Sequence, residues 1–515
     1  MSTPSARLPI VYVRGYAGGS PGIEKAVMDP FYGFNQGSTH IRVGREDNPV
    51  FYQFESPLLR LHLDEDYDIV VEGRQPLPDA PRPESIWIHR FYDVCSGTFG
   101  GTAEPFQLET AARDLLTLID QVRERTGAPR VNLVAHSMGG LICRCLIQKI
   151  IPEERGVRAS DYVAKLFTYG TPHGGITFSV GFGIPETLRD LFNFNGADIF
   201  GPRRMYQYLT SNPGAEPPEG WRAVDMPDDD GAGATPVADG GFPLDRVFCM
   251  VGTDAEDYDV AHGISAGAVG PRSDGLVQIE NAQVTGANRA FAYRSHSGRY
   301  GLVNSEEGYQ NLRRFLFGDL RARLDLVGVS LPEEDGVVWQ AEARLSVRGL
   351  PVLMNERVAE HWCPIQLSDP TPESRRTRAA LAGDDAVPLA TTFLSTRLPR
   401  PAQDDPLRFV LDVNLLSLRE QHGLFRFRDH VQTADFTDTL IIDVRPTGPG
   451  SAPVAWANWN SEVPGAIRGL SPEGEPLRDE DPTERSWASS IPLPATTRPI
   501  LGPDARIRLR VDPWC

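Results

Sequence analysis

The chain has little lysine and no cluster of positive charge. Only three of its 51 basic residues are lysine, and 69 acidic residues give the 515-residue chain a formal net charge of −18. The pI of the sequence is about 5.1. Binding to a phosphate backbone depends on clustered basic side chains, so we do not expect nucleic acid as a partner.

Long apolar segments are also missing. Arg14 ends the apolar run Ile10–Val13, whereas the core of a secretory signal needs roughly 7–15 apolar residues. The apolar stretch 141–151 contains an arginine and a lysine, and a membrane span needs about 20 apolar residues. We therefore expect no signal peptide and no membrane span. The expected location is the cytoplasm, with export by a signal-independent route as the open alternative.

Cofactor motifs are missing as well. The six cysteines show neither the spacing of a disulfide framework nor that of a zinc site. The glycine-rich stretch 15–19 lacks both a Gly-Lys-Ser/Thr ending and a Gly-x-Gly-x-x-Gly pattern, which excludes a nucleotide-binding loop. Asp254, Asp257 and Asp259 could imitate a calcium site, but isolated acidic residues are usually solvated. We expect free thiols, no metal and no cofactor.

The length predicts two or three domains, because single cores stop growing beyond about 250–300 residues. Strand-like and helix-like segments alternate within residues 1–318. Such alternation is typical of an α/β domain in which helices cover both faces of a parallel sheet. Strands are predicted at 8–14, 85–91, 130–135, 163–169 and 246–251, and helices at 103–126, 138–151 (stopping at Pro152) and 304–317.

Two segments interrupt this alternation of strands and helices, and the pattern of apolar and polar residues changes after residue 318. Residues 29–73 form an irregular block of aromatic and polar residues. The stretch 173–245 is long enough to be a cap or lid. Its Phe178 and Phe182 would line a substrate-binding wall, although core packing is the commoner use of such side chains. Short alternating runs then predict an antiparallel β-sandwich over 319–515.

The most specific motif surrounds Ser137. An apolar strand leads directly into this serine and a helix follows at once, while Ala135 and Gly139, two residues away on either side, are small. A nucleophile elbow requires this pattern, because its serine occupies a sharp strand-to-helix turn that only small neighbours permit. The backbone N–H of Met138 would then point at a developing oxyanion.

The runs Ala-His-Ser-Met-Gly-Gly (135–140) and Tyr-Gly-Thr-Pro-His-Gly-Gly (169–175) resemble the α/β-hydrolase superfamily. Within it, the chain is similar to bacterial triacylglycerol lipases and to esterases of the GPI-inositol deacylase and lecithin–cholesterol acyltransferase kinds. The resemblance covers roughly residues 7–318 and implies an α/β-hydrolase fold with the order nucleophile, acid, histidine. It also implies that the backbone N–H of Tyr16 is the second donor to the oxyanion. Arg14, two residues before Tyr16, stands where many members of the superfamily have histidine.

The implied order leaves two candidates for the catalytic histidine and two for the catalytic acid. His296 lies just before the last predicted helix, where the family places its catalytic histidine, and His262 is the alternative. Asp274 is the expected acid, because a tight turn before an apolar run can present its carboxylate to the histidine of the next loop. Asp254 is the alternative acid. The carboxylate is needed to fix the tautomer of the histidine and to stabilise its charged form.

We therefore expect a serine hydrolase that cleaves carboxylic esters through Ser137, His296 and Asp274 with an acyl-enzyme intermediate. Its substrate would be a small-molecule or lipid ester, with contact to a lipid interface through the lid. An acyltransferase, thioesterase or amidase would use the same residues. A non-catalytic binding protein that acts through the β domain is the alternative from a different class. The ester chain length, the oligomeric state and the task of the β domain stay open.

Overall fold

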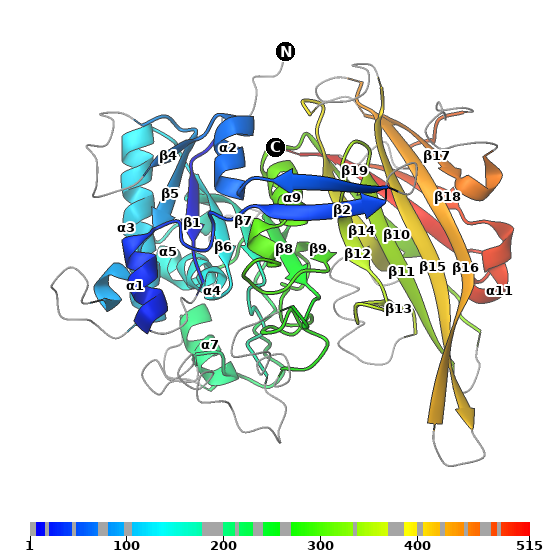
Figure 1. Cartoon of the computed structure of the whole chain (residues 1–515), viewed down its shortest axis with the longest axis horizontal. Coiled ribbons are helices and arrows are strands. Elements are labelled where there is room, and N and C mark those ends of the chain that lie inside the picture. The colour runs from blue at the N-terminus through cyan, green and yellow to red at the C-terminus, as the bar shows by residue number, and fades with distance from the viewer. Residues whose placement is uncertain are drawn as a thin grey trace. The chain divides into compact units, whose positions relative to one another are not determined.

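Two units of different architecture make up the chain (Figure 1). The first, called here the mixed unit, contains Ser5–Arg289 and Tyr293–Tyr309, and the second, the β unit, includes Ala290–Ala292 and Gln310–Cys515. The domain boundary expected near residue 318 stays a prediction. The computed structural model describes residues 7–15, 20–43, 48–70, 81–96, 106–177, 199–211, 216–229, 240–257, 269–332, 337–368, 386–398, 405–422, 428–447, 452–463, 475–480 and 486–514.

A seven-stranded sheet organises the first part of the chain. Its strands lie in the order β4 (Asp68–Val70), β5 (Ser85–His89), β1 (Ile10–Val13), β6 (Val131–His136), β7 (Val163–Tyr169), β8 (Val247–Gly252) and β9 (Asn288–Ala292). The neighbours from β4 to β8 pair in parallel. Parallel neighbours need crossover connections, and this explains the alternation of strands and helices in the sequence.

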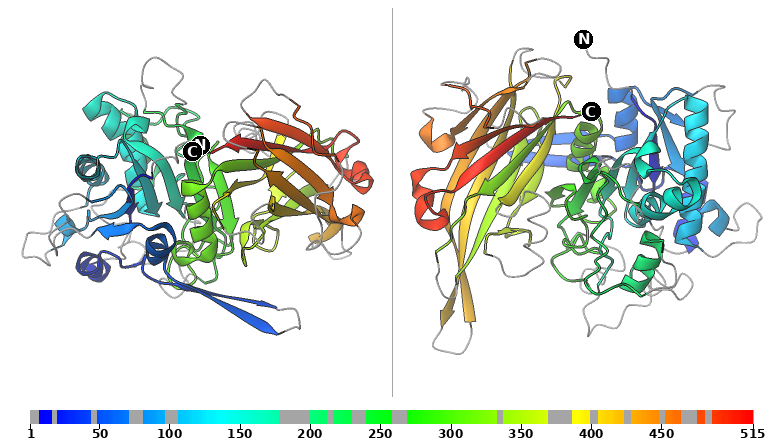
Figure 2. Two further views of the ribbon diagram at one scale, coloured as in Figure 1. Left: turned by 90° about the horizontal axis from the view of Figure 1, so that it is seen from above. Right: turned by 180° about the vertical axis from the view of Figure 1, so that it is seen from behind.

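Helices cover both faces of this sheet (Figure 2). The helix α3 (Leu108–Thr126) buries an apolar stripe in the same core as Val11 and Val13 of β1. On the opposite face, the hydroxyl of Tyr169 donates to the carbonyl of Gly308 in α9 (Glu306–Phe317) over 3.4 Å. No helix among the described residues is both long and apolar enough to cross a membrane. The other helices are α1 (Ser20–Met28), α2 (Pro57–Glu65), α4 (Met138–Cys145), α5 (Ile151–Arg155) and α7 (Pro202–Leu209).

The predicted stop of a helix at Pro152 is wrong. After α4, a π-helical segment spans Leu146–Ile150, and α5 then continues as far as Arg155. Proline is tolerated in the first turn of a helix, where its missing N–H has no partner to lose. The π-helical hydrogen-bond pattern of the preceding segment lets α5 begin as a new first turn around Pro152.

The irregular block expected over 29–73 is also wrong in part. It contains an antiparallel ribbon of β2 (Ser38–Val43) and β3 (Pro49–Phe54), followed by α2 and β4. Ile41 and Phe51 face each other across this ribbon and are both exposed. A ribbon with exposed apolar side chains lacks the alternation of buried and polar positions by which strands are recognised.

Two antiparallel sheets share one apolar core in the β unit. The α/β class of the first part and the all-β class of the second are thus confirmed. One sheet has the order β14 (Ala386–Leu394), β10 (Leu320–Val327), β19 (Arg506–Pro513) and β18 (Trp487–Pro492). The other has the order β12 (Leu353–Arg357), β11 (Val337–Val347), β15 (Leu407–His422), β16 (Arg428–Arg445) and β17 (Val454–Trp459), with β13 (Ile365–Gln366) beside β11 and a short helix α11 (Arg498–Leu501) elsewhere in the unit.

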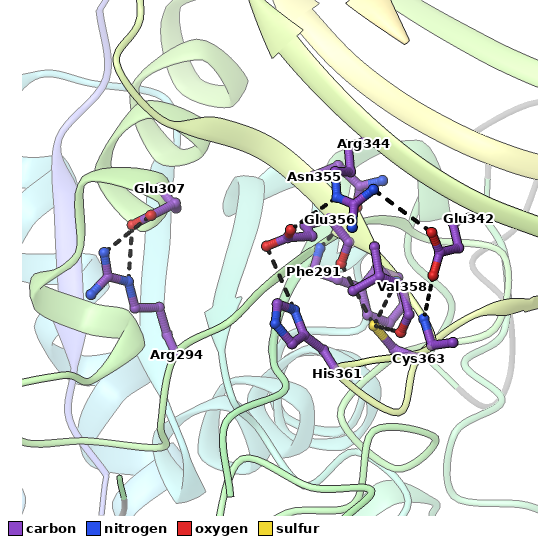
Figure 3. A network of polar contacts seen from close by, with 11 residues as sticks. Phe291, Arg294, Glu307, Glu342, Arg344, Asn355, Glu356, Val358, His361 and Cys363 are labelled. Atoms are coloured by element: carbon purple, nitrogen blue, oxygen red, sulfur yellow. Dashed lines mark hydrogen bonds and ion pairs between the residues drawn. The ribbon is translucent and has the colours of Figure 1, made fainter. Parts of the chain in front are cut away.

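Charged side chains link β11, β12 and the loop that follows them (Figure 3). Arg344 of β11 lies 3.3 Å from a carboxylate oxygen of Glu356 and 3.7 Å from one of Glu342. His361 contacts the other oxygen of Glu356 at 3.6 Å, and Glu342 accepts the backbone N–H of Ala359 over 2.9 Å. The group therefore holds the 358–363 loop against its two strands.

Candidate active site

Ser137 occupies the turn between β6 and α4. Its φ of 53° and ψ of −128° lie in a region that residues other than glycine rarely adopt. The backbone N–H of Ser137 donates to the carbonyl of Tyr169 over 2.9 Å, and its carbonyl accepts the hydroxyl of Thr171 over 2.9 Å. Strained backbone persists where surrounding contacts determine it, and such strain is concentrated at functional sites.

The small residues around Ser137 have a direct steric cause. A Cβ atom on Gly139 would lie 2.3 Å from the carbonyl oxygen of Val13, and one on Gly15 would lie 2.7 Å from Cβ of Ser137. Real Cβ atoms do not approach backbone atoms so closely. The start of α4 therefore packs directly on the end of β1, and only glycine permits this approach.

Ser137, His296 and Asp274 form one hydrogen-bonded chain. Nε2 of His296 lies 2.8 Å from Oγ of Ser137, and Nδ1 of His296 lies 2.8 Å from Oδ2 of Asp274. The three residues are 6 %, 3 % and 0 % exposed in the order Ser137, His296, Asp274. An ionised carboxylate can only accept, so the proton of the neutral imidazole is on Nδ1. Nε2 is then free to accept the proton of the Ser137 hydroxyl.

The tight turn expected at Asp274 is present. Its second carboxylate oxygen, Oδ1, accepts the backbone N–H groups of Leu276 (3.1 Å) and Val277 (2.8 Å), and Gly275, directly after Asp274, has a φ of 93°. The backbone N–H of His296 also donates to the carbonyl of Asp274 over 2.8 Å. Both carboxylate oxygens of Asp274 are thus fixed, one by the turn and one by the histidine.

The alternative acid lies in a different environment. Asp254 follows β8 directly, and its Oδ1 accepts the backbone N–H groups of Glu256 (3.0 Å) and Asp257 (3.1 Å). Burial raises the pKa of Asp254 to about 6. The alternative histidine His262, like Asp259, lies outside the described residues. Within the described part of the chain, no group of three or more His, Cys, Asp or Glu residues could hold a metal ion.

The other predicted site residues are placed only in part. Met138 is the first residue of α4 and is buried, so its backbone N–H lies at the helix N-terminus beside Ser137. Tyr16, Phe178 and Phe182 lie outside the described residues. Arg14 donates from its guanidinium to the carbonyl oxygen of Tyr32 over 2.7 Å.

The segment 173–245, expected to be a cap, contributes one α-helix, α7, among the described residues. Within it, Arg204 of α7 makes a bidentate ion pair with Glu109 of α3, with distances of 2.7 Å and 2.6 Å. Buried Arg144 of α4 donates to the carbonyl of Ala223 over 2.6 Å. These contacts tie the segment to α3 and α4, whereas movement of a lid stays a prediction.

Two glycines beneath the Asp274–His296 pair were missed from the sequence as part of the site. A Cβ on Gly170, whose φ is 50°, would lie 2.8 Å from Oδ2 of Asp274 and 3.1 Å from Nδ1 of His296. A Cβ on Gly252 would lie 2.7 Å from Cβ of Asp274. Gly170 directly follows β7 and Gly252 ends β8. A glycine at the carboxyl end of an apolar strand is the sequence signal that could have revealed both.

A family model described as the α/β hydrolase fold matches residues 78–186. This range holds β5, β6 and β7 together with the turn at Ser137. The first part of the chain thus has the α/β-hydrolase fold. No curated protein matches the chain.

Three solved structures resemble the chain at low identity. The Bacillus licheniformis lipase BlEst2 in its mature form is 16% identical, with 61% of this chain and 94% of that chain covered and a TM-score of 0.30. Its propeptide form is 13% identical, with 89% and 98% covered and a TM-score of 0.30. A gene product from Listeria innocua is 14% identical, with 60% and 94% covered and a TM-score of 0.27. Scores this low carry no argument about activity.

Proposed function

We propose that this α/β hydrolase is a serine hydrolase that cleaves carboxylic esters. The observation that carries the proposal is the continuous chain of hydrogen bonds, 2.8 Å each, from Ser137 through His296 to Asp274. A serine hydroxyl is a weak nucleophile by itself, and a histidine base oriented by a carboxylate activates it. Near-complete burial keeps water from competing for these hydrogen bonds.

In the first half of the reaction, Oγ of Ser137 attacks the carbonyl carbon of the ester, and Nε2 of His296 takes the hydroxyl proton. The electron pair of the carbonyl bond moves to its oxygen. Asp274 stabilises the imidazolium that forms, because its Oδ2 accepts from Nδ1. When the tetrahedral intermediate collapses, the bond to the alcohol oxygen breaks and His296 gives that oxygen its proton.

Backbone N–H groups hold the negative charge in this intermediate. That of Met138 lies at the N-terminus of α4, where the helix dipole adds to the stabilisation. The N–H of Tyr16, which follows β1, is the proposed second donor. In the second half, water attacks the acyl carbon while His296 takes a proton from this water. The bond between the acyl carbon and Oγ of Ser137 then breaks, His296 returns the proton to Oγ, and the carboxylic acid leaves.

The test of this function uses p-nitrophenyl esters and a fluorophosphonate probe that labels activated serines. Wild-type protein should hydrolyse the esters and be labelled, and Ser137→Ala should fold normally and lose both. Ser85→Ala, which changes a buried serine of β5, is the matched control and should keep both. A wild type that neither hydrolyses nor labels would refute the proposal and favour a binding protein.

The leaving group and the substrate interface need a second comparison. We propose an ester in preference to an amide or thioester, and a set of p-nitrophenyl butyrate, the matching anilide and the matching thioester tests this directly. The proposed role of 173–245 as a lid, with Phe178 and Phe182 in its wall, predicts a rise in rate when a longer-chain ester exceeds its solubility limit. A rate that declines smoothly with the chain length of the ester would refute the role of the segment as a lid, but it would leave the proposed esterase activity intact.

A further inference from the structure

A second histidine, His136, lies directly before Ser137 and has no part in the proton transfers described above. Its Nε2 lies 2.9 Å from the backbone carbonyl oxygen of His296. The two imidazole rings have their centroids 4.9 Å apart and are inclined by 41°. This hydrogen bond joins residues 160 positions apart in the sequence. It connects the turn at Ser137 to the loop that carries His296, residues 293–302, called here the His296 loop.

The direction of this hydrogen bond follows from the chemistry of the two groups. A carbonyl oxygen can only accept, so Nε2 of His136 carries the hydrogen and donates it. Burial, together with the neighbouring His296 and Arg14, lowers the pKa of His136 to about 3. His136 is therefore neutral at physiological pH and holds one tautomer.

The main chain of His296 is held on both sides. Its N–H donates to the carbonyl of Asp274 over 2.8 Å, and its C=O accepts from His136 over 2.9 Å. Two residues earlier, Arg294 makes a bidentate ion pair with Glu307 of α9, at 3.1 Å for each contact (Figure 3). The ion pair anchors the start of the loop, whereas the His136 bond acts on His296 itself.

We propose that His136 is a positioning residue, whose Nε2–H holds the carbonyl of His296 so that the imidazole stays in line with Ser137. This inference rests on the proposed serine hydrolase function. Residues 136 and 137 each bind His296, one through its main chain and one through its side chain. Ser137 and Asp274 hold the two ring nitrogens of His296, and the His136 bond holds the main chain from which this ring extends.

The chain offers a matched control for this bond. His89 at the end of β5 is buried, and its Nε2 lies 3.0 Å from the backbone carbonyl of Ala111 in α3. Burial lowers its pKa to about 4. The same kind of bond is thus present at His89, but it binds a helix and not the His296 loop.

The experiment compares His136→Leu, His136→Gln and His89→Leu with wild type on a soluble p-nitrophenyl ester. We expect His136→Leu to lower kcat about 10- to 100-fold with little change in KM, because a misplacement of about 1 Å can cost that much. Glutamine offers an N–H at a similar distance from the main chain, so His136→Gln should recover most of kcat. His89→Leu should lose stability and keep kcat. Equal losses in the two leucine variants, or no recovery by glutamine, would overturn the proposal.

Amide hydrogen exchange provides a readout that does not depend on turnover. Residues 293–302 should exchange faster in His136→Leu than in wild type or in His89→Leu at equal overall stability. Unchanged exchange there would overturn the positioning role even if kcat fell. If wild type neither hydrolyses esters nor reacts with the fluorophosphonate, the proposed function fails, and faster exchange would still support the link between His136 and the His296 loop.

Discussion

Replacement of Asp274 by asparagine tests the tautomer of His296 while it preserves the shape of the site. In wild type, Oδ1 accepts from the amides of Leu276 and Val277, and Oδ2 accepts from Nδ1 of His296. An asparagine has one accepting oxygen and one donating NH₂ group. The outcome depends on which of the two faces the histidine.

The turn decides this orientation. If the asparagine oxygen keeps the amides of Leu276 and Val277, its NH₂ points at Nδ1 of His296. The reversed rotamer would leave two buried N–H donors without acceptors, at about 1–3 kcal/mol each, so it is disfavoured by several kcal/mol. With NH₂ opposite, Nδ1 must accept, and the imidazole proton moves to Nε2. Nε2 then cannot take the proton of Ser137.

We therefore expect Asp274→Asn to lower kcat about 10⁴-fold, equivalent to about 5.5 kcal/mol of activation free energy, with little change in KM. The assay is hydrolysis of a p-nitrophenyl ester, and Asp254→Asn is the matched control with unchanged kcat. A loss of less than about tenfold in Asp274→Asn would refute the tautomer argument. A larger loss in Asp254→Asn would refute the choice of acid.

Three further predictions concern stability, measured by urea denaturation. Burial raises the pKa of Asp254 from 3.8 to about 6, so between these pH values the folded state holds a proton that the unfolded state releases, and the stability of wild type falls as pH rises. Across this window Asp254→Asn should become more stable than wild type by about 1–2 kcal/mol, with solvent screening allowed for. A difference in stability that shrinks with rising pH would contradict this. Gly139→Ala places a Cβ against backbone and should lower the free energy of unfolding by at least about 3 kcal/mol, whereas Gly156→Ala, with a φ of 65° in open space, should lower it by about 1 kcal/mol. Similar losses in the two variants would show that the backbone of β1 moves to accommodate the added Cβ. Asp443→Asn leaves the buried Arg408 guanidinium, now held by bonds of 2.8 Å and 2.7 Å, without its counter-charge and should cost about 3–5 kcal/mol, and an unchanged midpoint would exclude this.

Much of the fold follows from apolar periodicity. The strand predicted at 163–169 has those bounds in the structure, and the helix predicted at 304–317 begins two residues later, at Glu306. Periodicity failed where local rules were overridden. The π-helical segment before Pro152 allowed a helix to continue, and the ribbon 38–54 exposes its apolar side chains, so it lacks the alternation of buried and polar positions that marks a strand.

The three residues of the site differ in how clearly the sequence identifies them. Ser137 is recognisable because steric needs of the turn appear as small residues at fixed spacing. His296 follows from its place between the last strand of the sheet and the last helix. The acid is harder, because Asp254 and Asp274 both lie between β8 and β9, and the order nucleophile, acid, histidine accepts either.

The structure suggests why spacing cannot choose between these acids. Ser137 is placed by the sheet, since its turn directly continues β6. Asp274 and His296 lie on loops, and their mutual position depends on individual hydrogen bonds: His296 N–H to the Asp274 carbonyl, and Nε2–H of His136 to the His296 carbonyl. The first bond connects two main-chain atoms and the second ends on a main-chain carbonyl, and since every residue type has these atoms, such bonds leave little trace in the sequence. The residue types therefore predict the chemistry, but the partner of each residue is decided by loop hydrogen bonds that only the folded chain contains.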